Sequence, residues 1–130
     1  MITGVKQRIK EGEPNKPTRF FSSNQEKSVA KAVGGKRTVN SGATMFGGKS
    51  DVSIKNLFNL ECKTKTKSSD SISIKKEWFD KNKKEALFDG NLYSAIVFSF
   101  GPNEENHYII DEFLFQELVE YLKNKHNIVW

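Results

Sequence analysis

The sequence predicts an α/β fold in which a mixed central β-sheet is flanked by helices. Residues 51–65 alternate polar and apolar side chains, as two neighbouring strands do, and LYSAIVFSF, residues 92–100, is an apolar run of strand length. The segments before, between and after these strands carry helix start and stop signals. The expected order of elements is α-β-β-β-α-β-β-α, and a chain of 130 residues fits one compact domain.

Residues 1–20 are predicted to form a flexible basic arm, followed by a single domain over residues 21–130. Gly12, Pro14 and Pro17 interrupt any helix in the arm. Its positive charges are Lys6, Arg8, Lys10, Lys16 and Arg19. Arms of this kind commonly bind the phosphate backbone of nucleic acids, and the alternative is a tail without a role.

The first element of the domain is expected to be a short helix in SSNQEKSVAKAVGG, residues 22–35. Ser23 is a suitable N-cap, Glu26 follows three residues later as in a capping box, and two glycines end the segment. A short strand over residues 36–40 and a glycine-rich turn at residues 41–43 are expected next.

Two strands are expected within residues 51–65, joined by a turn near Lys55 and Asn56. Side chains two apart on a strand share a face. One face of the second strand would carry Asn59, Glu61, Lys63 and Lys65. The opposite face would carry Phe58, Leu60, Cys62 and Thr64.

A helix over residues 74–89 should follow, capped by Ser73 and ended by Gly90, with Trp78 and Ala86 pointing inward. The apolar run at residues 92–100 then suits a central strand that is buried on both faces.

The last elements are expected to be a strand in HYII, residues 107–110, and a helix capped by Asp111. The apolar residues of this helix recur at helical spacing and are Leu114, Leu118, Tyr121 and Leu122.

Charge and composition favour an intracellular protein that binds a polyanion. The net charge is +5 and the isoelectric point is about 9.3, which favours nucleic acid as a partner, although a basic surface can serve solubility alone. The single cysteine, Cys62, excludes an internal disulfide and fits a reducing compartment. No apolar run reaches the ~20 residues that cross a bilayer, and no secretory signal is evident, so a cytoplasmic protein without a membrane partner is expected.

The segment GGKSDVSIKNLFNLECKTK places Asp51 ahead of one strand and Glu61 and Lys63 on one face of the next. An antiparallel pairing would bring Asp51 beside Glu61, and two adjacent carboxylates repel unless a cation lies between them. Oxygen ligands favour Mg²⁺ or Mn²⁺. A metal ion and a lysine together would suit hydrolysis of a phosphodiester. The alternative is a solvated network of ion pairs, because these residue types are common.

Five features in order resemble the PD-(D/E)xK nuclease superfamily, and within it the archaeal-type Holliday junction resolvases and their phage-encoded relatives. They are the helix QEKSVAKAVGG with its early glutamate, the NSGA segment, the GGKSDV strand entry, the LECK strand end, and the SIKKEW helix before an apolar strand. The resemblance implies a restriction-endonuclease-like αβββαβ core. Ser50 stands where the superfamily motif has proline.

The resemblance also implies roles for individual residues. Asp51, Glu61 and the backbone carbonyl of Cys62 would bind the catalytic Mg²⁺, for which Mn²⁺ would substitute. Lys63 would be the motif lysine, and Glu26 would complete the acidic site through a second metal ion or a water; the capping box is its alternative role. Two further residues would act at the scissile phosphate: Ser41 would contact it or shape the site, and Gly42 would allow close approach of the backbone.

By the same resemblance, the protein would resolve Holliday junctions in DNA recombination and repair, in the host cytoplasm if phage-encoded. A homodimer would place two symmetric nicks and leave 5′-phosphate and 3′-hydroxyl ends. The alternatives are a nuclease of the same fold acting on other duplex or branched DNA, and a DNA-binding module without catalysis.

Basic residues around the proposed site are candidates for binding DNA, although a solvated face is the alternative for each of them. Those near the motif are Lys49, Lys65, Lys67, Lys75 and Lys76, and those in the arm are Lys6, Arg8, Lys10 and Arg19.

Overall fold

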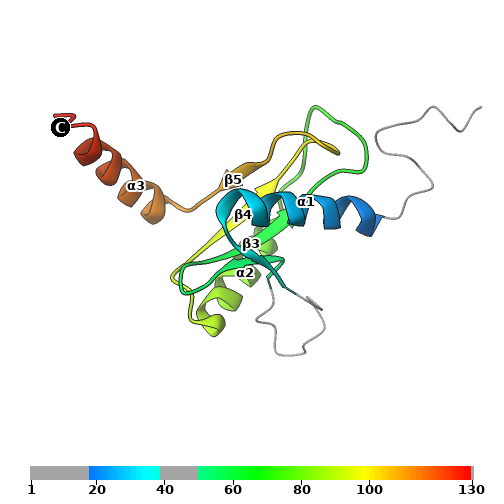
Figure 1. Ribbon diagram of the computed structural model, residues 1–130, viewed down its shortest axis with the longest axis horizontal. Coiled ribbons are helices and arrows are strands. Elements are labelled where there is room, and N and C mark those ends of the chain that lie inside the picture. The colour runs from blue at the N-terminus through cyan, green and yellow to red at the C-terminus, as the bar shows by residue number, and fades with distance from the viewer. Residues whose placement is uncertain (1–17, 39–49, 130) are drawn as a thin grey trace, which may run out of the picture.

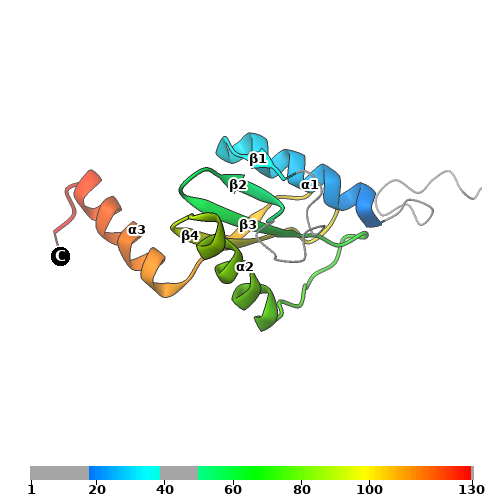
Figure 2. The same ribbon diagram turned by 90° about the horizontal axis from the view of Figure 1, so that it is seen from below.

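The computed structural model describes residues 18–38 and 50–129, which form a mixed five-stranded sheet with helices on both of its faces (Figures 1 and 2). The elements in chain order are α1 (Thr18–Val33), β1 (Lys36–Arg37), β2 (Val52–Ile54), β3 (Phe58–Lys63), α2 (Lys76–Asp89), β4 (Tyr93–Phe98), β5 (His107–Ile109) and α3 (Glu112–Lys125). The α/β class, the mixed sheet and the predicted order of elements are confirmed.

The strands lie side by side in chain order, β1-β2-β3-β4-β5, so β3 occupies the middle of the sheet. The pairs β1–β2, β2–β3 and β4–β5 are antiparallel, and β3–β4 is parallel. A parallel pair needs a long crossover, which α2 supplies. The helix α2 crosses one face of the sheet, and α1 covers the opposite face (Figure 2).

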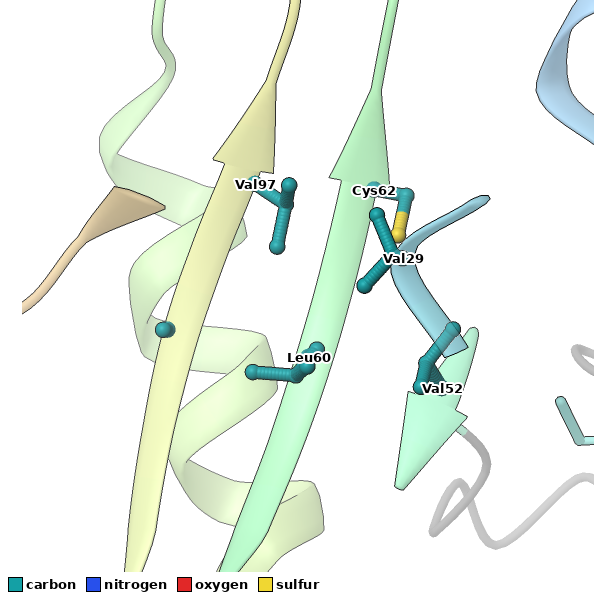
Figure 3. Packing of buried hydrophobic residues seen from close by; sticks show 6 residues of the cluster. Val29, Val52, Leu60, Cys62 and Val97 are labelled. Carbon is teal, nitrogen blue, oxygen red and sulfur yellow. The ribbon is translucent and has the colours of Figure 1, made fainter. Parts of the chain in front are cut away.

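The apolar core lies between α1 and the sheet. Val29 of α1 packs against side chains from three strands, Val52, Leu60, Cys62 and Val97 (Figure 3). These residues alternate with polar ones along β2 and β3, as a half-buried strand requires. The alternation therefore turns Cys62 into the core and leaves Glu61 and Lys63 on the face that α2 covers.

The contact between α2 and the sheet is partly polar. Asn82 is 2% exposed, and its Nδ2 donates to the carbonyls of Asn59 at 3.2 Å and Ala95 at 3.0 Å. One amide on the helix thus joins the two parallel strands, β3 and β4. This contact fixes where α2 lies over the strand that carries Glu61 and Lys63.

The helix α1 begins at Thr18, five residues before the predicted N-cap Ser23. The helical conformation therefore includes residues 18–20 of the predicted arm, and Phe21 is buried. Ser23 lies within the helix, so the prediction that it caps the helix is wrong. The physical reason is that no proline or glycine follows Pro17 until Gly34, so nothing in the chain stops the helix from extending back to Thr18.

The helix α2 also begins differently from the prediction. Its N-cap is Lys75, which makes no side-chain capping bond, so Ser73 does not cap it. The partly buried side chains of Ile72 and Ile74 precede the helix. The predicted stop is confirmed, since Gly90 ends the helix with a positive φ of 78°, a conformation that glycine adopts without strain.

The final helix, α3, projects away from the rest of the molecule and buries none of its residues (Figure 1). Its predicted N-cap is confirmed: the carboxylate of Asp111 accepts from the backbone N–H of Leu114 at 3.0 Å. Within the described residues, none of the three helices combines the length and apolar character that a bilayer-spanning helix needs.

Candidate active site

Asp51 directly precedes β2, and Glu61 lies on the neighbouring strand β3. Val52 pairs with Leu60 in this antiparallel ladder, and the backbone N–H of Asp51 donates to the carbonyl of Leu60 at 3.1 Å. Asp51 and Val52 therefore both face Leu60, as at a β-bulge. The ladder does not pair Asp51 with Glu61, but the charge of Asp51 raises the pKa of Glu61, so the two carboxyl groups lie close together.

The backbone of β3 holds the Asp51 carboxylate in place. Its Oδ2 accepts from the N–H of Cys62 at 2.8 Å. The carbonyl of Leu60 points toward β2, because it accepts from Asp51. Backbone carbonyls two residues apart on a strand point the same way, so the Cys62 carbonyl also points to the side of Asp51.

Lys63 lies between Glu61 and Trp78. Its Nζ is 3.3 Å from Oε2 of Glu61 and 4.3 Å from the centre of the Trp78 ring, a distance typical of a cation–π contact. Trp78 comes from α2, is partly buried and does more than fill the core. The helix over this face of the sheet therefore positions Lys63.

Burial raises the pKa of both carboxyl groups, and the charge of Asp51 also raises the pKa of Glu61. Burial has the largest effect on Asp51, and the N–H of Cys62 and the charge of Lys63 act against it. Burial also raises the pKa of Glu61, the negative charge of Asp51 adds to this, and Lys63 opposes both. A bound cation would stabilise the charged form of two neighbouring carboxyl groups that otherwise resist ionisation.

Glu26 reaches the same region from α1 and is held by Arg37 of β1. Oε1 of Glu26 is 3.1 Å from Nη2 of Arg37, which also donates to Oγ of Ser23 at 3.0 Å. Burial raises the pKa of Glu26, and the charge of Asp51 raises it further. The capping-box role is excluded because Ser23 lies inside the helix. Glu26 instead interacts electrostatically with Asp51, whose charge raises its pKa.

The donor set fits Mg²⁺ with few protein ligands. Within residues 18–38 and 50–129, no group of three or more His, Cys, Asp or Glu side chains is arranged to hold a metal ion. Mg²⁺ is commonly bound through one or two carboxylates and keeps several waters. Asp51, Glu61 and the Cys62 carbonyl supply two carboxylates and one carbonyl from adjacent strands. The Cys62 thiol is buried on the other face, where burial raises its pKa.

The predicted DNA-binding residues that the structure describes are spread around this region. Arg19 lies in the first turn of α1, and its charge lowers the pKa of Glu26. Nζ of Lys65 donates to Oγ of Ser69 at 3.4 Å, and Lys67 and Lys75 are exposed. Lys76 forms an exposed ion pair with Asp80 at 3.4 Å. The predicted residues outside the described ranges are Lys6, Arg8, Lys10, Ser41, Gly42 and Lys49.

Two residues near the site were not predicted from the sequence. The charge of Lys81 lowers the pKa of both Asp51 and Glu61, and it lies one helical turn after Trp78. Gln25 precedes Glu26, and its Nε2 donates to the carbonyl of Lys63 at 2.8 Å. The spacing of Trp78 and Lys81 on one helix was the available signal for Lys81.

No family model, curated protein or solved structure matches this chain. The resemblance to the nuclease superfamily therefore depends on the motif residues themselves.

Proposed function

We propose that this protein is a metal-dependent endonuclease that hydrolyses phosphodiester bonds in branched DNA, with the four-way Holliday junction as its substrate. Mg²⁺ is the proposed cofactor, Mn²⁺ a substitute, and a homodimer the proposed active form. One observation carries the proposal. Asp51 lies close enough to Glu61 for its charge to raise the pKa of Glu61, and the Nζ of Lys63 lies 3.3 Å from Glu61.

The proposed chemistry divides between the metal ion and the chain. When bound, Mg²⁺ lowers the pKa of a coordinated water and screens the charge of the phosphate. Asp51 and Glu61 would bind the ion, and the N–H of Cys62 fixes the orientation of Asp51. Lys63 would hold the attacking water or neutralise the negative charge that develops on the phosphate oxygens.

The position of Lys63 suits this role because two contacts restrict it. Its ammonium group is held between the Glu61 carboxylate and the face of Trp78. A charge that is already oriented costs little reorganisation when the reaction occurs, and removal of such a group typically lowers the rate by ~10²-fold or more. Trp78 is therefore a positioning residue in this proposal.

DNA would be bound mainly through its phosphates. Lys67 and Lys75 are exposed on the segment between β3 and α2, and Arg19 lies near Glu26 on α1. Contacts of this kind position a duplex without reading its bases. Selection of a junction would then depend on the shape of the branch and on two active sites in a two-fold dimer.

The decisive assay compares nicking of an immobile four-way junction with nicking of a linear duplex of the same sequence, with and without Mg²⁺. The wild type should nick the junction faster, and EDTA should abolish the reaction. Asp51→Asn, Glu61→Gln and Lys63→Ala should lose cleavage and keep most of their junction affinity.

Each alternative predicts a different result in this assay. Equal rates on junction and duplex would indicate a nuclease of the same fold with another substrate. Binding without nicking, in Mg²⁺ and in Mn²⁺, would indicate a DNA-binding module without catalysis. Cleavage at the wild-type rate by any of the three variants would show that the site is assigned to the wrong residues.

A further inference from the structure

The helix α3 carries an apolar stripe that the described part of the chain leaves largely exposed. Leu118 is 40% exposed and Phe115 is 55% exposed. At 3.6 residues per turn, Leu114, Leu118 and Leu122 follow one another on one side of the helix. Exposed apolar surface of this extent on a small domain commonly marks an interaction site.

The stripe continues onto the body of the protein. A groove of about 240 Å³ lies between the end of α2 and the start of α3, and its lining includes Leu87, Leu92 and Leu114. Leu87 is 81% exposed and Leu92 is 72% exposed. The "α3 face", defined here as Leu87, Leu92, Leu114, Phe115, Leu118 and Leu122, therefore runs from the groove along the helix.

The distribution of charge along α3 selects its partner. The first half carries the acidic side chains Glu112 and Glu117, and the last turn carries Lys123 and Lys125. A parallel pair of these helices would oppose like charges along its length. An antiparallel pair opposes the acidic half of each helix to the basic end of the other.

We propose that the α3 face is the homodimer interface, in which α3 packs antiparallel against α3 of a second copy. Glu112 and Lys123 are eleven residues apart, about three full turns, so they lie on the same flank of the stripe. With the two-fold axis near Leu118, Glu112 lies opposite the partner's Lys123, and this contact occurs twice.

The size of the interface explains the role of the groove. A helix of 14 residues offers a stripe about 21 Å long and about 10 Å wide. A stable interface takes about 800 Å² from each partner, so the helix alone is too small. In the antiparallel arrangement the exposed Ile128 and Val129 of one copy extend beyond α3 to the groove of the other.

The test measures the mass of the full chain by sedimentation equilibrium, without DNA or metal ion. The wild type should sediment as a dimer, at twice the chain mass of 14.8 kDa, and Leu118→Asp as a monomer. Circular dichroism should show that the variant keeps its fold, because Leu118 is not part of the core.

A charge exchange tests the antiparallel register. Glu112→Lys should raise the dimer dissociation constant about tenfold, and the added change Lys123→Glu should bring it back to within about threefold of the wild type. Glu120→Lys is the matched control, because Glu120 lies about 200° around the helix from Leu118 and should leave the constant unchanged.

Three results would overturn the interface: a monomeric wild type at ~100 µM, a dimer that Leu118→Asp leaves intact, or a double variant no tighter than Glu112→Lys. The dimer is part of the proposed function, but this measurement is independent of cleavage. If the interface is wrong, the proposed metal site is unaffected. If the protein forms the predicted dimer but does not cleave DNA, only the proposed nuclease activity is refuted.

Discussion

The structure predicts that Asp51→Asn makes the metal-free protein more stable at pH 7.5. The asparagine has the same shape, and its Oδ1 can still accept from the N–H of Cys62, which now donates to Asp51 at 2.8 Å. What is lost is one negative charge near Glu61 and Glu26.

The magnitude follows from the spacing of side chains on neighbouring antiparallel strands. Opposite and diagonal neighbours lie about 5–8 Å apart, and two like charges at ~5–8 Å repel by about 2–3 kcal/mol at an effective dielectric constant of about 20. Lys63, water and salt reduce this repulsion. We therefore expect a gain of about 1–2 kcal/mol, which corresponds to a rise in Tm of about 3–8 °C for a domain of this size.

The gain should depend on pH in a defined direction. The folded-state pKa values of Asp51 and Glu61 are raised, so the wild type loses stability as pH rises from the ordinary carboxyl pKa of about 4 through the raised values. Below about pH 4 both carboxyls are protonated in the folded and unfolded states, and the advantage of the variant should disappear.

Thermal unfolding of the wild type and Asp51→Asn at pH 7.5 and at pH 4 measures this difference. Asp70→Asn is the control, because Asp70 is exposed in the loop after β3 and its substitution should change stability by less than about 0.5 kcal/mol. If Asp51→Asn is no more stable than the wild type at pH 7.5, the two carboxylates do not repel and the proposed metal site is incorrect.

Three further predictions concern the surroundings of the site. Trp78→Leu should lower the cleavage rate by about tenfold with little change in DNA affinity, because the ring that holds Lys63 Nζ at 4.3 Å is lost; an unchanged rate in single-turnover kinetics would contradict this role. Asn82→Ala should lower the free energy of unfolding in urea by about 2–3 kcal/mol, because the buried amide donates hydrogen bonds to two strands. A loss below about 0.5 kcal/mol would show that other contacts hold α2 against the sheet. Lys67→Ala together with Lys75→Ala should weaken junction binding and reduce the slope of log affinity against log salt concentration by about 2; an unchanged slope would place the DNA elsewhere.

The order of elements was predictable because local patterns decide it. Alternation along β3 separates Cys62 from Glu61 and Lys63, and Gly90 is the glycine that a helix end with positive φ favours. The same alternation, joined to an antiparallel pairing, was enough to predict that Asp51 lies near Glu61, although the strand register pairs Val52, not Asp51, with this part of β3.

Helix starts and long-range contacts were harder to predict. Ser23 has the residue type of an N-cap, but the helix continues back to Thr18, where nothing interrupts it. The pair between Glu26 and Arg37 depends on how β1 lies against α1, and the effect of Lys81 on the carboxylates depends on which face of α2 meets the sheet. The apolar spacing in α3 predicts a helix. It does not predict that the helix projects from the body of the protein with its own apolar side chains exposed.

Direct binding of Mn²⁺, followed by the loss of the free-ion signal in electron paramagnetic resonance, tests the central claim without any DNA. The wild type should bind at least one ion per chain, and both Asp51→Asn and Glu61→Gln should weaken that binding by at least tenfold, while Asp70→Asn should not. Equal binding by the wild type and both site variants would contradict the claim that these two strands hold a catalytic metal ion.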